Sequence, residues 1–335
     1  MMEDSHNPSR SRLPRRSSIS EEWPVLDHDD LVGGDWPEDR PLLAEGESGV
    51  LFPQGRAIVY GAPGSYKSYL MQQLGYCAAA GLDWLNYSFA QICKVLYVVG
   101  EGVPAMYASR AKGISSGQPT LGRFHIIMAG RDRKLINEAR WVHMAELAEK
   151  YGPDILIIDP IYQFMSGGEN DDQATSDFLG HWDWLVEKYN LSVILTHHQT
   201  KASISIDSDG YIGLRGHSNL IGWPDTILAV RQARDGPEVI LRWEKMRRAG
   251  LPPARVVRFD GQRMVVADTD PATVMLELLE RGSMSPRTLD DEVAEICGLG
   301  RRTIENVRAT LERSGQVHST VDKKDKRRRL VSLHG

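Results

Sequence analysis

The most informative stretch of this chain is residues 56–68, which read Arg56-Ala57-Ile58-Val59-Tyr60-Gly61-Ala62-Pro63-Gly64-Ser65-Tyr66-Lys67-Ser68. Residues 56–60 are apolar enough for a buried strand, and residues 68–80 repeat apolar side chains at helical spacing. A strand, a glycine-containing loop and a helix in this order form a phosphate-binding arrangement, because the loop N–H groups and the helix dipole both favour an anion.

We therefore predict that residues 61–68 bind ATP. Lys67 would reach the β- and γ-phosphate oxygens, and Ser68 would ligate Mg²⁺. The loop departs from the pattern G-x-x-x-x-G-K-[ST] at one position, where Tyr66 replaces the last glycine. A non-glycine residue there must either tolerate the backbone conformation of the loop or shift it. The alternative, a chance Gly/Pro turn before a helix, is weaker because the strand and the helix flank the loop as required.

Working outward, the pattern predicts an α/β fold. Continuous apolar strands are expected at residues 95–99, 124–128, 154–159 and 191–196, with helices at 141–151 and 174–189. Such strands separated by helices indicate a mostly parallel sheet with helices on both faces. After residue 225 the pattern changes, and strands at 226–231, 238–243, 255–259 and 264–267 predict an antiparallel edge.

Two carboxylates are expected beside the phosphates. Asp159 ends an all-apolar strand, which is where a second Mg²⁺-coordinating group belongs, although it could be an ordinary strand terminus. Glu101 follows the strand at 95–99 and is placed to polarise the attacking water, with a helix-capping acid as the alternative.

Two further groups of polar residues follow later strands. His197 and His198 can sense the γ-phosphate. A metal site there is rejected, because adjacent side chains at a strand end diverge and no third ligand is evident. Lys245 and Arg247 follow the strand at 238–243 and point the same way. They fit an arginine finger acting on a neighbouring subunit's nucleotide and, equally, a solvated basic turn.

The C-terminal region reads as a different unit. Helices are expected at 272–280, from Pro286 onward and at 301–314, followed by a hairpin, which together predict a winged helix-turn-helix. From residue 301 to the end, ten Lys and Arg face four Asp and Glu, an excess of +6 (10 − 4). We predict DNA contact there over protein docking. Arg301, Arg302, Asn306 and Arg308 are expected to face outward, and the predicted DNA-binding residues are Arg301, Arg302, Lys324, Lys326 and Arg327.

Composition sets limits on location and partners. The 335 residues carry a formal net charge of −5, so any DNA contact must come from local basic patches. Three separated cysteines suit a reducing cytoplasm, and no apolar run reaches the ~18 residues of a membrane span. We expect a cytoplasmic protein without a membrane partner, and a disordered Ser/Arg-rich tail over residues 1–30.

The order of these motifs resembles RecA-like P-loop ATPases of the hexameric-helicase branch, in the RepA-like group. The resemblance covers about residues 40–268, and its motifs are residues 61–68, 99–102, 157–160, 197–198, 214–218 and 245–247. It implies a RecA-like ATPase domain (31–268) before the winged-helix domain (270–335). It also implies a ring of identical subunits, such as a hexamer, with ATP at the interfaces.

The resemblance also assigns roles to particular residues. It implies Glu101 as catalytic carboxylate, Asp159 as Walker-B acid, His198 (or His197) as γ-phosphate sensor, and Lys245-x-Arg247 as the finger. DNA, with single strands favoured, would pass through the centre of the ring. Of the two loops expected there, residues 162–173 are acidic, so the loop at 200–215, with Lys201 and Arg215, is the better candidate.

Three functions remain open from the sequence. The first is an ATP-dependent DNA motor, helicase-like, in replication or recombination and repair. The second is a DNA-binding regulator or loader that ATP switches, with the winged helix supplying the affinity. The third is a non-hydrolysing scaffold with a loop degraded at Tyr66; the set Glu101, Asp159 and Lys245-x-Arg247 favours the motor over it.

Overall fold

The computed structural model describes residues 27–35, 38–130, 134–135, 137–165, 172–198, 218–232, 238–252, 254–267, 270–297, 299–321 and 329–333. The short helix α1 (His28–Gly33) begins inside the segment 1–30 that was expected to be a disordered tail, and the boundary of that tail stays a prediction. Residues 1–26 lie outside the described part.

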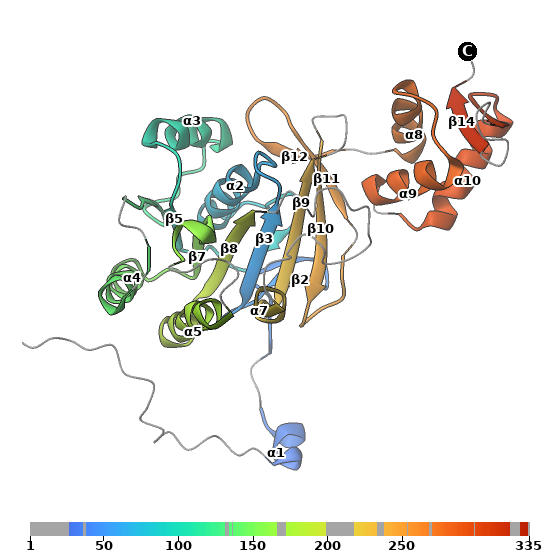
Figure 1. The fold of residues 1–335 in the computed structure, drawn as a ribbon. Helices are drawn as coiled ribbons and strands as arrows, with labels where there is room; N and C mark the ends of the chain where they lie inside the picture. Colours follow the sequence, from blue (N-terminus) through green and yellow to red (C-terminus); the bar gives the residue numbers. More distant parts are fainter. Residues whose placement is uncertain are drawn as a thin grey trace, which may run out of the picture.

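A nine-stranded sheet forms the centre of the molecule (Figure 1), with the strand order β12-β11-β10-β9-β3-β8-β7-β5-β6. Six strands run parallel: β3 (Arg56–Gly61), β5 (Val95–Val99), β6 (Phe124–Met128), β7 (Ile155–Asp159), β8 (Ser192–His198) and β9 (Thr226–Gln232). Three strands extend the sheet antiparallel: β10 (Val239–Met246), β11 (Arg255–Phe259) and β12 (Met264–Val266). The expected α/β class, a mostly parallel sheet with flanking helices and an antiparallel edge, is confirmed.

Helices cover both faces of the sheet, because each central strand is apolar on both sides. Alternate residues of one strand enter different cores: Ile194 packs with α2 (Lys67–Ala80), whereas Val193 packs with α4 (Glu138–Tyr151) and α5 (Asp172–Tyr189). The α2 side also carries α3 (Pro104–Ile114), and the other side carries α7 (Ser218–Gly222). This alternation determines which face each polar residue at a strand end will occupy.

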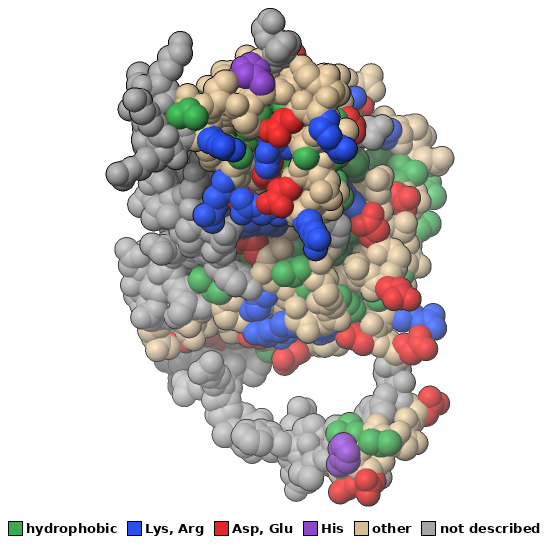
Figure 2. Space-filling view, turned by 90° about the vertical axis from the view of Figure 1, so that its right-hand side faces the viewer, with side chains coloured by type: hydrophobic (Ala, Val, Ile, Leu, Met, Phe, Trp, Pro, Cys, Tyr) green, Lys and Arg blue, Asp and Glu red, His purple; other side chains and the backbone are tan. Residues whose placement is uncertain are grey.

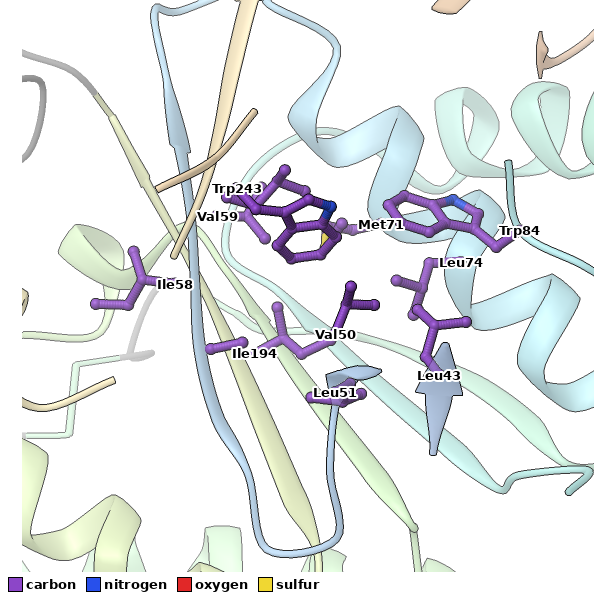
Figure 3. Close-up of a pocket in the computed structure, with 12 residues that line it drawn as sticks. Leu43, Val50, Leu51, Ile58, Val59, Met71, Leu74, Trp84, Ile194 and Trp243 are labelled. Atoms are coloured by element: carbon purple, nitrogen blue, oxygen red, sulfur yellow. The ribbon is translucent and has the colours of Figure 1, made fainter. Parts of the chain in front are cut away.

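A small sheet that the sequence did not predict packs beside α2. It consists of β1 (Leu43–Glu45), β2 (Ser48–Leu51) and β4 (Ser88–Phe89) in the order β2-β1-β4. Trp84 of this region and Trp243 of β10 line a small apolar cavity between the two sheets (Figure 3). Its wall is apolar throughout, so it is a packing defect of the core and offers nothing to a nucleotide.

The C-terminal unit has its own hydrophobic core. It contains α8 (Pro271–Glu280), α9 (Pro286–Cys297), α10 (Arg301–Arg313) and a hairpin of β13 (Val317–Val321) with β14 (Arg329–Leu333). These elements match the three helices and hairpin expected from the sequence, while the winged-helix assignment itself and the boundary at 268–270 stay predictions. Figure 1 shows this unit beside the antiparallel edge of the sheet, where α9 contacts β11.

None of the helices in the described part of the chain is long and apolar enough to cross a membrane.

Candidate active site

The loop between β3 and α2 has the backbone conformation of a phosphate loop with a tyrosine in a glycine-like position. Gly64 and Tyr66 both have positive φ, 82° and 67°, in the left-handed region that favours glycine. Gly61 is required for a different reason, since a Cβ there would lie 2.1 Å from the Val230 carbonyl oxygen. Tyr66 therefore tolerates the conformation that the missing glycine would have adopted.

Lys67 is buried at the first position of α2, with only 4% of its surface exposed. Its ammonium donates to the carbonyl oxygens of Gly61 (2.9 Å) and Ala62 (2.8 Å). Burial lowers its pKa to about 8, although the nearby carboxylates of Asp159 and Glu101 act to raise it. A buried cation whose hydrogen-bond partners are neutral is poised to bind an anion.

The end of β7 places Asp159 opposite the start of α2. Both carboxylate oxygens accept hydrogen bonds from hydroxyls: Oδ1 from Thr196 of β8 and Oδ2 from Tyr97 of β5. The Tyr97 hydroxyl also lies 3.3 Å from the Ser68 carbonyl oxygen, so it joins the carboxylate to the first turn of α2. Burial, and then the charge of Asp159, raise the pKa of Tyr97 well above its ordinary value, which keeps this phenol a donor.

Glu101 lies just beyond β5, exposed at the same edge of the sheet. Val99 pairs with Asp159 in the parallel register of β5 and β7, so the segments that follow these strands are neighbours. The Glu101 carboxylate oxygen Oε1 accepts hydrogen bonds from the Tyr162 hydroxyl and from Gln163 Nε2 (2.8 Å). Both donors belong to the short 3₁₀ helix η1 (Ile161–Gln163), directly after β7.

Strand alternation separates the two histidines. His198 lies two residues after Thr196 and so on the same face, and its ring centroid is 5.3 Å from that of Tyr162. Burial and the nearby Lys67 lower the pKa of His198, which is therefore neutral at pH 7. Its buried Nδ1 has no partner among the described residues. His197 is buried, and its Nδ1 forms a hydrogen bond with the His198 carbonyl oxygen. His198 is therefore the better candidate of the two for contact with a phosphate.

These residues fit Mg-ATP. No side chain caps the N-terminus of α2, so its first N–H groups are available to a phosphate beside Lys67 and the unpartnered His198 Nδ1. No group of three His, Cys, Asp or Glu in the described residues forms a metal site, but Mg²⁺ needs only one or two carboxylates besides phosphate oxygens. Ser68 and Asp159 would hold it.

Lys245 and Arg247 lie at the opposite end of the sheet from the phosphate loop. Lys245 belongs to β10, which extends beyond the expected strand end at residue 243, and β10 runs antiparallel to β3 and β9. Lys245 donates to the Ile221 and Gly222 carbonyls at the end of α7. Arg247 pairs with Asp225 (3.3 Å). Figure 1 shows α7 at this lower end of the strands, away from the turn into α2.

The predicted DNA-binding residues are only partly within the structure. Lys201, Arg215, Lys324, Lys326 and Arg327 lie outside the described residues. Arg301 is held by Asp291 (3.3 Å) and Glu305 (3.2 Å), whereas Arg302 is exposed and makes no polar contact within the described part. Figure 2 shows the side on which this unit lies, where basic side chains are interleaved with acidic ones rather than forming a uniform patch.

Arg308 does not face outward as expected. It forms a bidentate pair with Asp290 of α9 (2.8 and 2.9 Å), and that carboxylate is only 1% exposed. The helical period alone placed Arg308 on the outer face. Arg308 instead points inward, because α9 packs against α10 and brings the buried carboxylate of Asp290 to this position.

The chain belongs to the AAA_25 family, whose model, described as an AAA domain, matches residues 22–203. It is accordingly a P-loop ATPase. No curated protein matches the sequence. Among solved structures, the RadB recombinase is 17% identical with a TM-score of 0.47, covering 66% of this chain and 93% of that one. A second solved structure, described as an ATPase domain, is 12% identical with a TM-score of 0.49, covering 64% of this chain and 85% of that one.

The sequence did not reveal four residues of the site: Tyr97, Tyr162, Gln163 and Thr196. Tyr97 stands in the middle of an apolar strand, where tyrosine is an ordinary core residue. Thr196 could have been found, because a polar residue ending an apolar strand next to the Asp159 strand belongs to the same edge. Tyr162 and Gln163 gave no signal, since only the fold of η1 brings them to Glu101.

Proposed function

We propose that this ATPase is a DNA-acting motor, helicase-like, that hydrolyses ATP at the interfaces between identical subunits in replication or recombination and repair. The observation that carries the proposal is the arrangement of charges at the two ends of one sheet. Lys67, Asp159 and Glu101 converge around the phosphate loop, while Lys245 and Arg247 lie together at the far end.

The chemistry at the loop end follows from the side chains present. Lys67 neutralises the phosphates, and His198, neutral and short of a partner, is the candidate sensor of the γ-phosphate. Glu101 orients and polarises the attacking water. Ser68 and Asp159 would hold Mg²⁺, which would supply positive charge against the phosphates.

The far-end cations support catalysis between subunits rather than within one. Gly61 pairs with Val230, and Lys245 pairs with Ile227 on the same strand β9. Three residues (230 − 227) separate these positions, which is about 10 Å along a strand, and Arg247 lies further on. Neither cation can contact the nucleotide of its own chain, so a transition-state role requires a second copy whose phosphate loop faces this end.

Steady-state ATP hydrolysis, measured with and without single-stranded DNA, tests the proposal. The full chain should hydrolyse ATP faster when DNA is present, and Glu101→Gln should bind ATP but not turn it over. If Glu101→Gln hydrolyses ATP at the wild-type rate, Glu101 is not the catalytic carboxylate. If the full chain binds ATP without turnover in either condition, the motor is wrong and a switch or scaffold replaces it.

A second candidate is an ATP-switched DNA-binding regulator or loader, and one contact favours it. Glu295 of α9 pairs with Arg231 (3.5 Å) and Arg242 (3.9 Å). Both arginines also pair with the buried Glu244. The Glu244 carboxylate accepts a hydrogen bond (2.6 Å) from the hydroxyl of Tyr60, the residue before the phosphate loop. Removing residues 270–335 separates the candidates, because a central-channel motor keeps some salt-dependent DNA binding and a regulator loses nearly all of it.

A further inference from the structure

The carboxylate of Glu101 is fixed by two side chains from a different element. Tyr162 and Gln163, on η1, both donate to the same oxygen, Oε1. Contacts among the described residues leave Oε2 without a donor. Because Glu101 itself is exposed on a short connection after β5, its side chain would otherwise occupy several rotamers.

The two donors stand on a rigid support. Ile161 and Phe164 on either side of them are buried in the core, at 0% and 1% exposure. The turn is closed by backbone hydrogen bonds from Gln163 to Pro160 and from Phe164 to Ile161. An anchored turn that presents its polar side chains outward holds a neighbouring group within the narrow geometry that catalysis requires.

Tyr162 also contacts a second functional residue. Its ring packs against that of His198, at 5.3 Å between centroids, while its hydroxyl donates to Glu101. One side chain therefore touches both the residue assigned to the attacking water and the residue assigned to the γ-phosphate. The ring and the hydroxyl can be tested separately, because Phe retains the first and removes the second.

We infer that Tyr162 and Gln163 are positioning residues for ATP hydrolysis, which hold Oε1 of Glu101 and so present Oε2 to the attacking water. The inference rests on the proposed catalytic role of Glu101. It requires that loss of either donor lowers the rate of the chemical step while leaving ATP binding intact, since the Lys67 ammonium is held by Gly61, Ala62 and Ser65.

The test uses the full-length protein with Tyr162→Phe, Gln163→Ala and the double variant. Two matched controls are Tyr189→Phe, whose ring packs on Trp184, and Gln54→Ala, whose amide donates to the exposed Asn190. The double variant should lose about 10- to 100-fold in kcat, the range that a misplaced catalytic group costs. The KM for ATP and the affinity for a fluorescent ATP analogue should stay within about twofold, and both controls should match the wild type.

Glu101→Gln, measured first, separates the two ideas. If it abolishes turnover and the double variant keeps wild-type kcat, the positioning role is wrong while the catalytic role of Glu101 stands. If Glu101→Gln hydrolyses ATP normally, the catalytic assignment falls and the positioning role with it. If the melting curve of Tyr162→Phe shows that this variant does not fold, Gln163→Ala alone provides the test. When either change is combined with Glu101→Gln, the residual rate of ATP hydrolysis should fall no further, because the donors act through Glu101.

Discussion

Charged side chains are arranged differently at the phosphate-loop edge of the sheet and in the C-terminal unit. At the loop edge, Lys67, Asp159 and Glu101 form no ion pair with one another within the described residues, and each is held by neutral groups. In the C-terminal unit, acids and arginines pair directly, as Asp290 does with Arg308 and Asp291 with Arg301.

Charged groups that are held by neutral partners can still bind a charged ligand, whereas charged groups that pair with one another stabilise the fold. A buried ion held only by neutral donors or acceptors gains strongly when a charged ligand arrives, because its desolvation has already occurred. An ion that is already paired within the fold gains less from such a ligand. The net charge of the C-terminal unit therefore overstates its capacity to bind DNA.

The largest expected effect is at the loop edge. Lys67→Ala removes the buried cation that faces the phosphates and should abolish measurable ATP binding, a loss of more than about 100-fold in affinity. Binding of a fluorescent ATP analogue measures it. The control is Lys112→Ala on the exposed face of α3, which should bind normally. Comparable binding by the Lys67 variant would show that the loop does not use its lysine.

Next in size is the effect of the far-end cations. Arg247→Ala should lower kcat by about 10³-fold if it acts as a finger. Mixing Arg247→Ala subunits with Lys67→Ala subunits should restore part of the activity, because each lacks a different half of a shared site. Arg248→Ala is the control, because its contacts with Asp39, the Pro53 carbonyl and the Phe52 ring involve no residue of the site. Failure of every mixing ratio to restore activity would remove the support for interfacial sites.

Two arginines of α10, one paired with a buried carboxylate and one exposed, should differ in their effects on stability and on DNA binding. Arg308→Ala leaves the buried Asp290 carboxylate unpaired and should destabilise this unit by about 3 kcal/mol. Arg302→Ala, at an exposed position, should leave stability unchanged but weaken DNA binding and reduce its salt slope by about 1. Denaturant melts and DNA titrations at several salt concentrations measure both. An unchanged salt slope in Arg302→Ala would argue that α10 does not contact phosphates.

The smallest effect is a pH dependence of nucleotide binding. Lys67 has a pKa of about 8 in the folded protein, below its ordinary value because of burial. Above about pH 8 it loses its proton, and bound phosphates favour the protonated form, so ATP binding near pH 9 should take up part of a proton. Calorimetry in buffers of different ionisation enthalpy measures this uptake. The proton uptake by Lys67 should be much smaller at pH 7 than at pH 9. In Lys67→Arg it should be absent at pH 7 and at pH 9, because the guanidinium stays charged.

The ATPase part of the fold was predictable because its strands are long apolar runs. The strand bounds expected at residues 95–99 and 124–128 match β5 and β6 without a shift. The small sheet of β1, β2 and β4 escaped detection because its strands have two to four residues, too short for a periodic pattern. Helix α3 was also missed, since it buries only Tyr107 and Ile114 and shows a weak apolar face.

The sequence by itself determined the phosphate loop, the parallel order of apolar strands and the membership of Lys67, Asp159 and Glu101 in one site. Those features are local, or follow from the rule that parallel strands end at one edge. Only the tertiary structure decided that Tyr66 adopts a glycine-like conformation, that Tyr97 and Thr196 hold Asp159, and that Arg308 pairs with Asp290. These depend on contacts between residues far apart in the chain, which no local pattern records.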